Sequence, residues 1–305
     1  MDEELRNQAL YGTPNMSKEQ AAYIRLQDAA HRSERYYEKP LLLCYSGGKD
    51  SDALVQLAFE SGIDFEIVHS HTTADAPETV RYIRERFKEW EGKGINCMIE
   101  YPHYKGVRTS MWALIPQKIL PPTRVIRYCC EILKETSGDG RACATGIRWA
   151  ESLKRKQRGV NEAIAKKKEE KIILMNDNDD KRLLNERCMM HHKTICNPII
   201  DWSDAEVRDF LTDRKVEGNP LYKCGFSRVG CIGCPMASKH RWEEFRMFPK
   251  YRDLYIKSFN KSLEINKGKK LSFKDGYEMF LWWMEENPDQ ITFEGFDDWE
   301  DEYDG

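Results

Sequence analysis

Short apolar runs alternate with helically spaced apolar residues along the first two thirds of the chain. Residues 41–45 (Leu-Leu-Leu-Cys-Tyr) form a continuous apolar run before a glycine turn, which is typical of a strand buried on both faces of a parallel sheet. The helix expected next, at about 49–60, has Ala53, Leu54 and Leu57 on one stripe. By the same reasoning we expect strands at 65–69, 96–100, 141–145 and 194–200, a helix at 77–90 opened by a proline, and a helix capped by Ser203. This alternation implies a parallel sheet with helices on both faces.

The expected organisation is one α/β domain with a Rossmann-like parallel sheet, flanked by helical segments. Residues 1–36 are rich in charge and predict an N-terminal helical approach outside the core. Residues 37–235 form the α/β domain, with a charged insertion at about 154–193. Residues 236–305 predict a C-terminal helical cap with an acidic tail. The aromatic residues at helical spacing after Cys234 favour a packing face over a base-stacking stripe.

Composition and charge narrow the choice of partners. The 305 residues include 48 Lys and Arg against 51 Asp and Glu, and the net charge of -3 gives no overall attraction to nucleic acid or to an anionic membrane. The basic stretch at 154–171 could contact a polyanion, although charge runs more often only solvate a surface. No run approaches the ~20 apolar residues of a membrane helix, and the N-terminus lacks the features of a signal peptide. We therefore expect a cytoplasmic protein without membrane contact, in which ten cysteines indicate metal binding or redox chemistry rather than disulfides.

The segment Ser46-Gly47-Gly48-Lys49-Asp50-Ser51 lies between a predicted strand and a predicted helix. Its glycines let the backbone approach an anion closely, its two serines can donate hydroxyl hydrogen bonds, and Lys49 supplies positive charge. The helix start adds outward-pointing amides and a favourable dipole. The loop therefore predicts a phosphate or sulfate site, although its glycine spacing is neither that of a Walker loop nor that of the dinucleotide fingerprint. Arg148, just past a predicted strand, could hold such a group through two parallel hydrogen bonds, or form a surface ion pair.

The loop resembles the signature of the adenine-nucleotide alpha hydrolase superfamily, which includes the ATP pyrophosphatases and the phosphoadenosine phosphosulfate (PAPS) reductases. Three further segments resemble the reductase family in the same order along the chain: 76–79 (Ala-Pro-Glu-Thr), 146–152 (Gly-Ile-Arg-Trp-Ala-Glu-Ser) and 197–203 (Asn-Pro-Ile-Ile-Asp-Trp-Ser). The resemblance implies catalytic roles for Lys49, Asp50 and Arg148. It implies an adenine nucleotide held by Ser46, Gly47, Gly48, Lys49, Asp50, Ser51, Thr72, Glu78, Thr79, Gly146 and Arg148.

The cysteines supply a second candidate site. Cys231 and Cys234 form a CxxC turn, which suits zinc, an iron-sulfur cluster or a dithiol redox pair. In sulfonucleotide reductases with a four-iron, four-sulfur centre, a Cys-Cys pair and a later CxxC supply the ligands, a layout that Cys129 and Cys130 complete here. Lys134 resembles a basic residue that the family keeps close to its cluster. Adjacent cysteines point in different directions on a helix, so Cys130, Cys224, Cys231 and Cys234 are expected as the 4Fe-4S ligands, with Cys129 as the alternative and a structural zinc site still possible.

Three functions are compatible with these features. The first is reduction of an adenosine sulfonucleotide (APS or PAPS), with an electron donor such as thioredoxin or ferredoxin. The second is ATP pyrophosphatase chemistry, in which Mg2+ balances the leaving pyrophosphate and an adenylated acceptor receives sulfur, as in nucleic-acid phosphorothioation or thiolation. Two features favour this second function: the basic stretch at 154–171, and the absence of a cysteine after Cys234, since the reductases carry their nucleophilic thiol on a C-terminal tail. The fold and the motifs favour the first function. The third is a non-catalytic nucleotide or cluster sensor bound to a partner protein.

Overall fold

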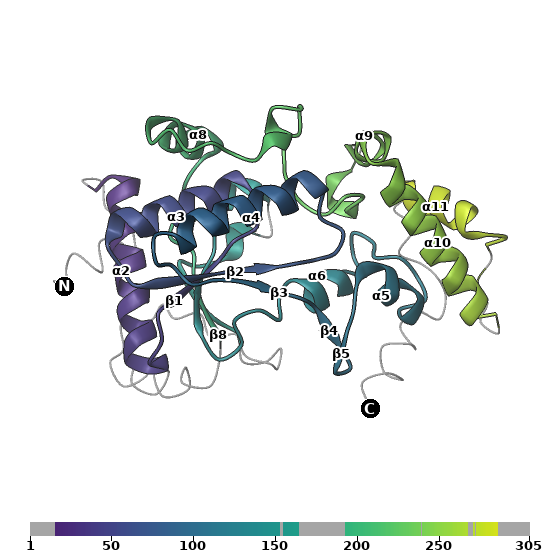
Figure 1. Cartoon of the computed structure of the whole chain (residues 1–305), viewed down its shortest axis with the longest axis horizontal. Helices are drawn as coiled ribbons and strands as arrows, with labels where there is room; N and C mark the ends of the chain where they lie inside the picture. Colours follow the sequence, from purple (N-terminus) through teal and green to yellow (C-terminus); the bar gives the residue numbers. More distant parts are fainter. Residues whose placement is uncertain are drawn as a thin grey trace. The chain divides into compact units, whose positions relative to one another are not determined.

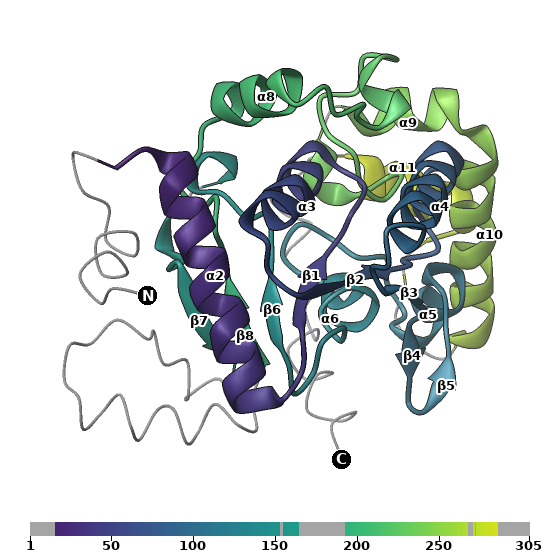
Figure 2. The same cartoon turned by 60° about the vertical axis from the view of Figure 1, so that its left-hand side comes forward.

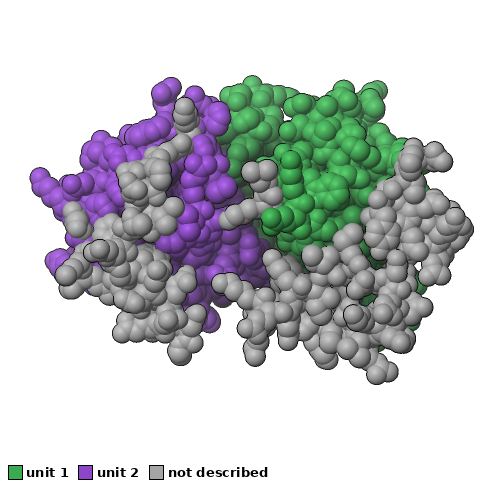
Figure 3. Space-filling view, turned by 180° about the vertical axis from the view of Figure 1, so that it is seen from behind, with its two compact units in different colours: residues 1–70, 77–100, 137–229 green, residues 71–76, 101–136, 230–305 purple. Residues whose placement is uncertain are grey.

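The computed structural model describes residues 16–152, 155–164, 193–238, 240–267, 271 and 273–285. The chain divides into two compact units, each built from three separate segments and coloured separately in Figure 3. Unit 1 comprises residues 1–70, 77–100 and 137–229, and unit 2 comprises residues 71–76, 101–136 and 230–305. The boundaries expected at residues 36 and 235 stay a prediction.

Unit 1 is built on a six-stranded, mostly parallel sheet in the order β3-β2-β1-β6-β8-β7. The strands are β1 (Leu41–Cys44), β2 (Phe65–Ser70), β3 (Cys97–Glu100), β6 (Ala142–Ala144), β7 (Asn161–Ile164) and β8 (Lys193–Cys196). Only the pairing of β7 with β8 is antiparallel in this sheet. The order reverses between β1 and β6, and ligands of open α/β sheets bind at such a switch point, beyond the carboxyl ends of the strands. The expected α/β class and parallel sheet are confirmed.

The helices of unit 1 share one large apolar cluster with the sheet. Among the described residues they are α2 (Lys18–Tyr37), α3 (Lys49–Ser61), α4 (Pro77–Glu91) and α8 (Asp204–Asp213). The unit also contains the short turns η1 (Trp149–Glu151), η2 (Arg155–Gln157) and η4 (Pro220–Tyr222). Leu41 and Leu43 of β1 belong to this cluster, whereas Leu42 belongs to a smaller cluster, because side chains alternate between the faces of a strand. Figure 2 shows α2 and α3 in front of the strands.

Three expectations about unit 1 need correction. The N-terminal helix is part of the core, because Ala22 and Leu26 of α2 are fully buried in the large cluster. The last parallel strand ends at Cys196, before the turn that starts with Asn197 and Pro198. The charged insertion contains the strand β7, which pairs with β8, while its residues 165–192 lie outside the described part of the chain.

Unit 2 contains a short hairpin and five helices among its described residues (Figure 1). They are β4 (His103–Tyr104), β5 (Val107–Arg108), α5 (Met111–Gln117), α6 (Tyr128–Leu133), α9 (His240–Met247), α10 (Pro249–Ile265) and α11 (Gly276–Met284), with the turn η5 (Pro235–Ala237) before α9. The sequence pattern indicated the helical character after residue 235. It did not indicate the hairpin, α5 or α6, which are too short to show a periodic pattern.

Aromatic rings form the core of unit 2. The Trp283 ring lies 4.6 Å from Tyr255 and 5.4 Å from Phe259, centroid to centroid, and all three side chains are buried. The packing role predicted for the aromatic residues is therefore correct for Tyr255 and Phe259. Trp242 is 49% exposed and packs edge-on against Phe280, with ring centroids 6.1 Å apart. Within the described residues, no helix is both long and apolar enough to cross a membrane.

Candidate functional site

The glycine loop closes tightly at the start of α3. Gly47 has a φ of +73°, and a Cβ atom there would meet Ile83 at 2.9 Å, so both conformation and space require glycine. The Ser51 hydroxyl donates to the Gly48 carbonyl (2.8 Å) and accepts from the Gly48 amide (3.2 Å). The loop is thus preformed, with the first turn of α3 directly behind it.

A segment that no functional motif indicated braces this loop. The Asn219 side-chain amide donates to the Gly47 carbonyl (3.0 Å) and to the Thr79 hydroxyl (3.1 Å), and all of Asn219 is buried. The Tyr222 hydroxyl accepts from the Lys49 amide (3.0 Å). Asn219 caps the turn η4, so one short segment positions both contacts. The only sequence signal for it is the pair Asn219-Pro220, a turn pattern without functional meaning by itself.

Lys49, Asp50, Arg148 and Asp204 form one network of two cations and two carboxylates. Arg148 donates from Nε to Asp50 (2.8 Å) and from a terminal nitrogen to Asp204 (2.7 Å). The Lys49 ammonium lies 3.0 Å from Asp50 and 2.9 Å from Asp204. Arg148 is 1% exposed, whereas the Asp204 side chain is 55% exposed. The network is therefore buried at Arg148 and open to solvent at Asp204.

The electrostatics of the network keep Asp204 ionised. The pKa of Asp204 is lowered to about 2, first because the Lys49 ammonium donates to it and then because Arg148 does. Asp204 was not among the predicted site residues. It follows directly after the N-cap Ser203, where an acidic residue is common in any helix, so its position gave no sign of a function. Its position near Lys49 and Arg148 depends on the fold.

Gly146 lets two strands' ends meet at this network. A Cβ atom at Gly146 would lie 2.7 Å from the Asp50 carbonyl oxygen, which is a backbone atom and cannot rotate away. Because the carboxyl end of β6 must pass the first turn of α3, only glycine fits there. Gly146 and Arg148, predicted together from one motif, are brought to the loop by the neighbouring strands β1 and β6.

A buried carboxylate lies behind the loop. Asp52 accepts from the Tyr45 hydroxyl (2.6 Å) and the Tyr82 hydroxyl (3.1 Å). Burial raises the pKa of Asp52 to about 6, although both tyrosine hydrogen bonds favour the ionised form. Asp52 therefore gains a proton more easily in the folded chain than in the unfolded one.

The raised pKa of Asp52 predicts a loss of stability with rising pH. The folded pKa exceeds the ordinary value of 3.8, so the favourable contribution of Asp52 is complete below pH ~4 and is lost as the pH rises through ~6. Over that window the contribution falls by about 3 kcal/mol, since a tenfold change in proton affinity corresponds to about 1.4 kcal/mol. In urea unfolding between pH 4 and 7, the Asp52→Asn variant should gain stability relative to the natural chain as the pH rises. A pH-independent difference between the two would contradict this assignment.

Four cysteines lie in unit 2 on two elements. Cys129 and Cys130 are on α6, and Cys231 and Cys234 are on the turn before η5. Gly233, with a φ of +75°, gives this turn its shape, and a Cβ atom there would meet the Phe245 ring at 2.3 Å. Backbone pairing of Asp75 with Cys231 fixes the turn from the other side.

The pKa values of the cysteine thiols and of nearby cations in unit 2 depend on one another. The pKa of Cys130 is lowered, first because Cys129 donates a hydrogen bond to it, and Lys134 and Arg127 add positive charge. Arg127 donates directly to the Cys130 sulfur (3.1 Å). The pKa of Lys134 is raised, first by Cys231 and also by Cys234 and Cys130. All four sulfurs therefore lie within electrostatic range of this group of charges.

The distances between the cysteine sulfurs can be compared with the geometry of a zinc site and of an iron-sulfur cluster. A closed tetrahedral zinc site, with Zn–S bonds of about 2.3 Å, brings its sulfurs to within roughly 4 Å of one another. Among the described residues, no three cysteine sulfurs lie within 4.8 Å of one another. An iron-sulfur cluster binds each thiolate through a different iron and tolerates wider spacing. Within the described residues, the cysteine sulfurs therefore show no closed zinc site.

Two of the predicted site residues belong to a different unit from their predicted partners. Cys224 is an exposed residue of unit 1, whereas the other three members of the predicted quartet, and the alternative ligand Cys129, belong to unit 2. Thr72 also belongs to unit 2, where its hydroxyl accepts from the Cys231 thiol (3.3 Å) and its amide donates to Asp75 (3.0 Å). Thr72 therefore contacts the cysteine turn, although it was predicted for the nucleotide.

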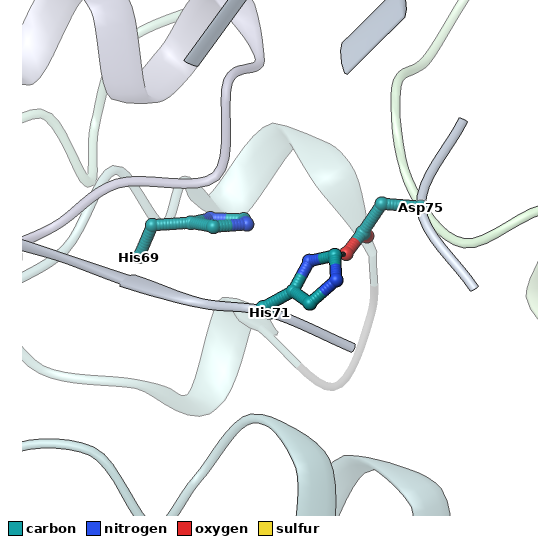
Figure 4. Close-up of side chains that lie close together, drawn as sticks. All are labelled: His69, His71 and Asp75. Carbon is teal, nitrogen blue, oxygen red and sulfur yellow. Dashed lines mark ion pairs between the residues drawn. The ribbon is translucent and has the colours of Figure 1, made fainter. Parts of the chain in front are cut away.

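Glu78, His69 and His71 are three further polar residues whose surroundings the structure describes. Glu78 stands in the first turn of α4, next to Thr79, and one of its carboxylate oxygens is buried without a hydrogen bond. Figure 4 shows His71 beside Asp75, and His71 Nδ1 lies 3.6 Å from the Asp75 carboxylate. His69, near the end of β2, has its Nδ1 atom 3.0 Å from the Tyr45 carbonyl. No motif in the sequence indicated these histidine contacts.

Comparison with known proteins identifies the family to which the chain belongs. Residues 40–237 match the family model described as the phosphoadenosine phosphosulfate reductase domain. The chain belongs to this family, as the four motifs indicated.

Individual relatives are more distant. An uncharacterized protein of Methanocaldococcus jannaschii is 25% identical over 224 residues, which cover 70% of this chain and 40% of that protein. The chain thus spans less than half the length of this relative. An adenosine 5'-phosphosulfate reductase of Allochromatium vinosum is 42% identical over 41 residues, 13% of this chain and 16% of that protein. The crystal structure of a PAPS reductase from Candida auris with phosphate matches 76% of this chain and 96% of that chain, at 14% identity and a TM-score of 0.44.

Proposed function

We propose that this chain is an enzyme that binds an adenosine sulfonucleotide on the loop 46–51 and a 4Fe-4S cluster on Cys129, Cys130, Cys231 and Cys234, and that it reduces the sulfonucleotide. The observation that carries the proposal is the grouping of these four cysteines with Lys134 in a chain that also has the preformed loop. Membership in the PAPS reductase domain family supports the same substrate class.

The residues of unit 1 have defined tasks in this proposal. The positive end of the α3 dipole and the Lys49 ammonium attract the anionic groups of the nucleotide. Arg148 holds Asp50 and Asp204 in place and supplies buried positive charge below them. Asn219 and Tyr222 keep the loop in its binding conformation. When bound, the cluster would supply electron-transfer capacity beside the positive charges of Lys134 and Arg127.

The reaction needs an external dithiol such as reduced thioredoxin. One of its thiolates attacks the sulfur atom, forms an S–S bond and displaces the phosphate oxygen. Its second thiol then attacks the first sulfur of the dithiol, so that a disulfide forms and sulfite leaves with the two electrons. The other product is AMP from adenosine phosphosulfate, or adenosine 3',5'-bisphosphate from PAPS. Lys49 would stabilise the negative charge that develops on the departing phosphate oxygen.

The carboxylate pair at the loop favours a second candidate, ATP pyrophosphatase chemistry. Asp50 and Asp204 both contact Lys49, and the low pKa of Asp204 keeps it negative at neutral pH. Carboxylates beside a phosphate loop are ligands that Mg2+ prefers, and Mg2+ would balance a triphosphate. In this case an acceptor attacks the α-phosphorus, and pyrophosphate leaves on the loop. The acceptor, a nucleic acid or a small molecule, would then receive sulfur.

One parallel assay separates the candidates. Anaerobically purified, iron-loaded protein is given adenosine phosphosulfate, PAPS or ATP, each with a dithiol and Mg2+, and nucleotides and sulfite are measured by chromatography. Sulfite from a sulfonucleotide, absent from a Lys49→Ala control, supports reduction. Formation of AMP and pyrophosphate from ATP, without sulfite from either sulfonucleotide, would instead support ATP pyrophosphatase chemistry. Tight nucleotide binding without turnover of any of the three would indicate a sensor.

A further inference from the structure

A basic segment without acidic residues runs through unit 2. Between Glu100 and Glu131 the chain has no Asp or Glu, but it carries Lys105, Arg108, Lys118, Arg124 and Arg127. The whole chain has a net charge of -3, so this segment is a strong local departure from the average. Such a departure marks a candidate surface for a polyanion.

The hairpin β4–β5 presents part of this segment to solvent. Lys105 and Gly106 form its turn, with φ values of +52° and +77°, which is the backbone of a tight two-residue hairpin turn. His103, Lys105 and Arg108 are exposed, and Val107 is 69% exposed. Figures 1 and 2 both show the turn at the free end of the hairpin.

Two tyrosine rings alternate with these cations. The Lys105 and Lys118 ammonium groups lie 5.7 Å and 5.2 Å from the centre of the Tyr104 ring. The Arg108 guanidinium carbon lies 3.8 Å from the centre of the Tyr101 ring. Both rings are half-buried, so each is held in place but still reaches the surface. A cation and the aromatic ring beneath it attract each other, so each helps to fix the position of the other.

We infer that this surface, defined as Tyr101, Tyr104, Lys105, Arg108 and Lys118, binds single-stranded nucleic acid. Three cations beside these rings can neutralise phosphates of a flexible strand, and the tyrosine rings and the guanidinium offer planar groups on which unpaired bases can stack. An anionic membrane or an acidic peptide would use the charges but has no planar groups for the rings. The surface shares no residue with the adenine-nucleotide loop, since its residues belong to unit 2 and the loop to unit 1.

The test measures fluorescence anisotropy of short labelled single-stranded RNA and DNA of mixed sequence, titrated with the full chain at several salt concentrations. The variant Lys105→Gln/Arg108→Gln/Lys118→Gln should bind at least about tenfold more weakly than the natural chain. For this variant, the slope of the logarithm of the binding constant against the logarithm of the salt concentration should be about 2 less steep than for the natural chain. Each phosphate contact to a single strand contributes about 0.7 to this slope. Tyr101→Leu and Tyr104→Leu should each weaken binding about tenfold through lost stacking.

A matched control removes the same charge elsewhere in unit 2. Lys250, Lys257 and Lys261 are exposed on α10, and the variant with all three changed to Gln should bind like the natural chain. Circular dichroism and thermal unfolding verify that each variant is folded, and turnover of adenine nucleotides should be unchanged in all of them. Equal weakening by both triple variants, absence of oligonucleotide binding, or binding only to vesicles of anionic lipid would overturn the inference.

Discussion

Replacing Arg148 with glutamine is expected to weaken binding of the adenine nucleotide roughly 100-fold and to abolish turnover. The buried guanidinium is the one group that contacts both carboxylates and the Trp202 carbonyl at the base of the network. Without it, Asp50 and Asp204 are left with Lys49 as their shared cation, and the loop faces excess negative charge that repels a phosphate. The same change should lower the free energy of unfolding by about 3 kcal/mol, because it removes one partner of a partly buried charge network.

Two control variants separate binding from stability. Arg148→Lys keeps the charge, but an ammonium group cannot span two carboxylates and a carbonyl in the way that a guanidinium does, so affinity should recover only in part. Arg25 is another buried arginine of unit 1, bonded to Asp201 and to the Pro198 carbonyl. Arg25→Gln should cost similar stability and leave nucleotide affinity intact. Isothermal titration with each nucleotide and urea unfolding give both quantities, and unchanged affinity in Arg148→Gln would refute the assigned role.

Serine substitution at Cys129, Cys130, Cys231 or Cys234 is expected to lower the iron content from about four atoms per chain to less than one. A cluster that loses one thiolate is poorly held, because the serine hydroxyl stays protonated at neutral pH and is a harder ligand. Iron and acid-labile sulfide are measured after anaerobic reconstitution of each variant, together with visible absorption. A centre that takes up one zinc atom per chain and no iron would contradict the cluster.

Cys224→Ser is the matched control for this series. Cys224 is exposed and belongs to unit 1, so its replacement should leave iron content unchanged. The opposite pattern, in which Cys224→Ser loses iron and Cys129→Ser keeps it, would restore the ligand set expected from the sequence. The series thus decides between two quartets that differ in one residue.

Much of the site could be predicted from the sequence because its parts are local. The loop 46–51 joins a strand to a helix without interruption, so its glycines, its serines and the helix start act together within six residues. The same holds for the cysteine turn, whose Gly233 lies between two ligand candidates. A continuous motif contains its own geometry, and the strand-helix alternation around it fixes the α/β class.

Contacts between distant segments were decided only by the tertiary structure. Arg148 meets Asp50 and Asp204 across 98 and 56 residues, and Asn219 reaches Gly47 across 172. Nothing in the local pattern of Asp204 or Asn219 distinguishes them from ordinary residues at helix and turn starts. The fourth cluster ligand stays a prediction: a local argument about helix direction favours Cys224 over Cys129, and Cys224 belongs to a different unit from the other candidates. Local sequence therefore determined which chemical groups this protein carries, and the order of the strands, which sets the neighbours of each loop, decided which of those groups meet.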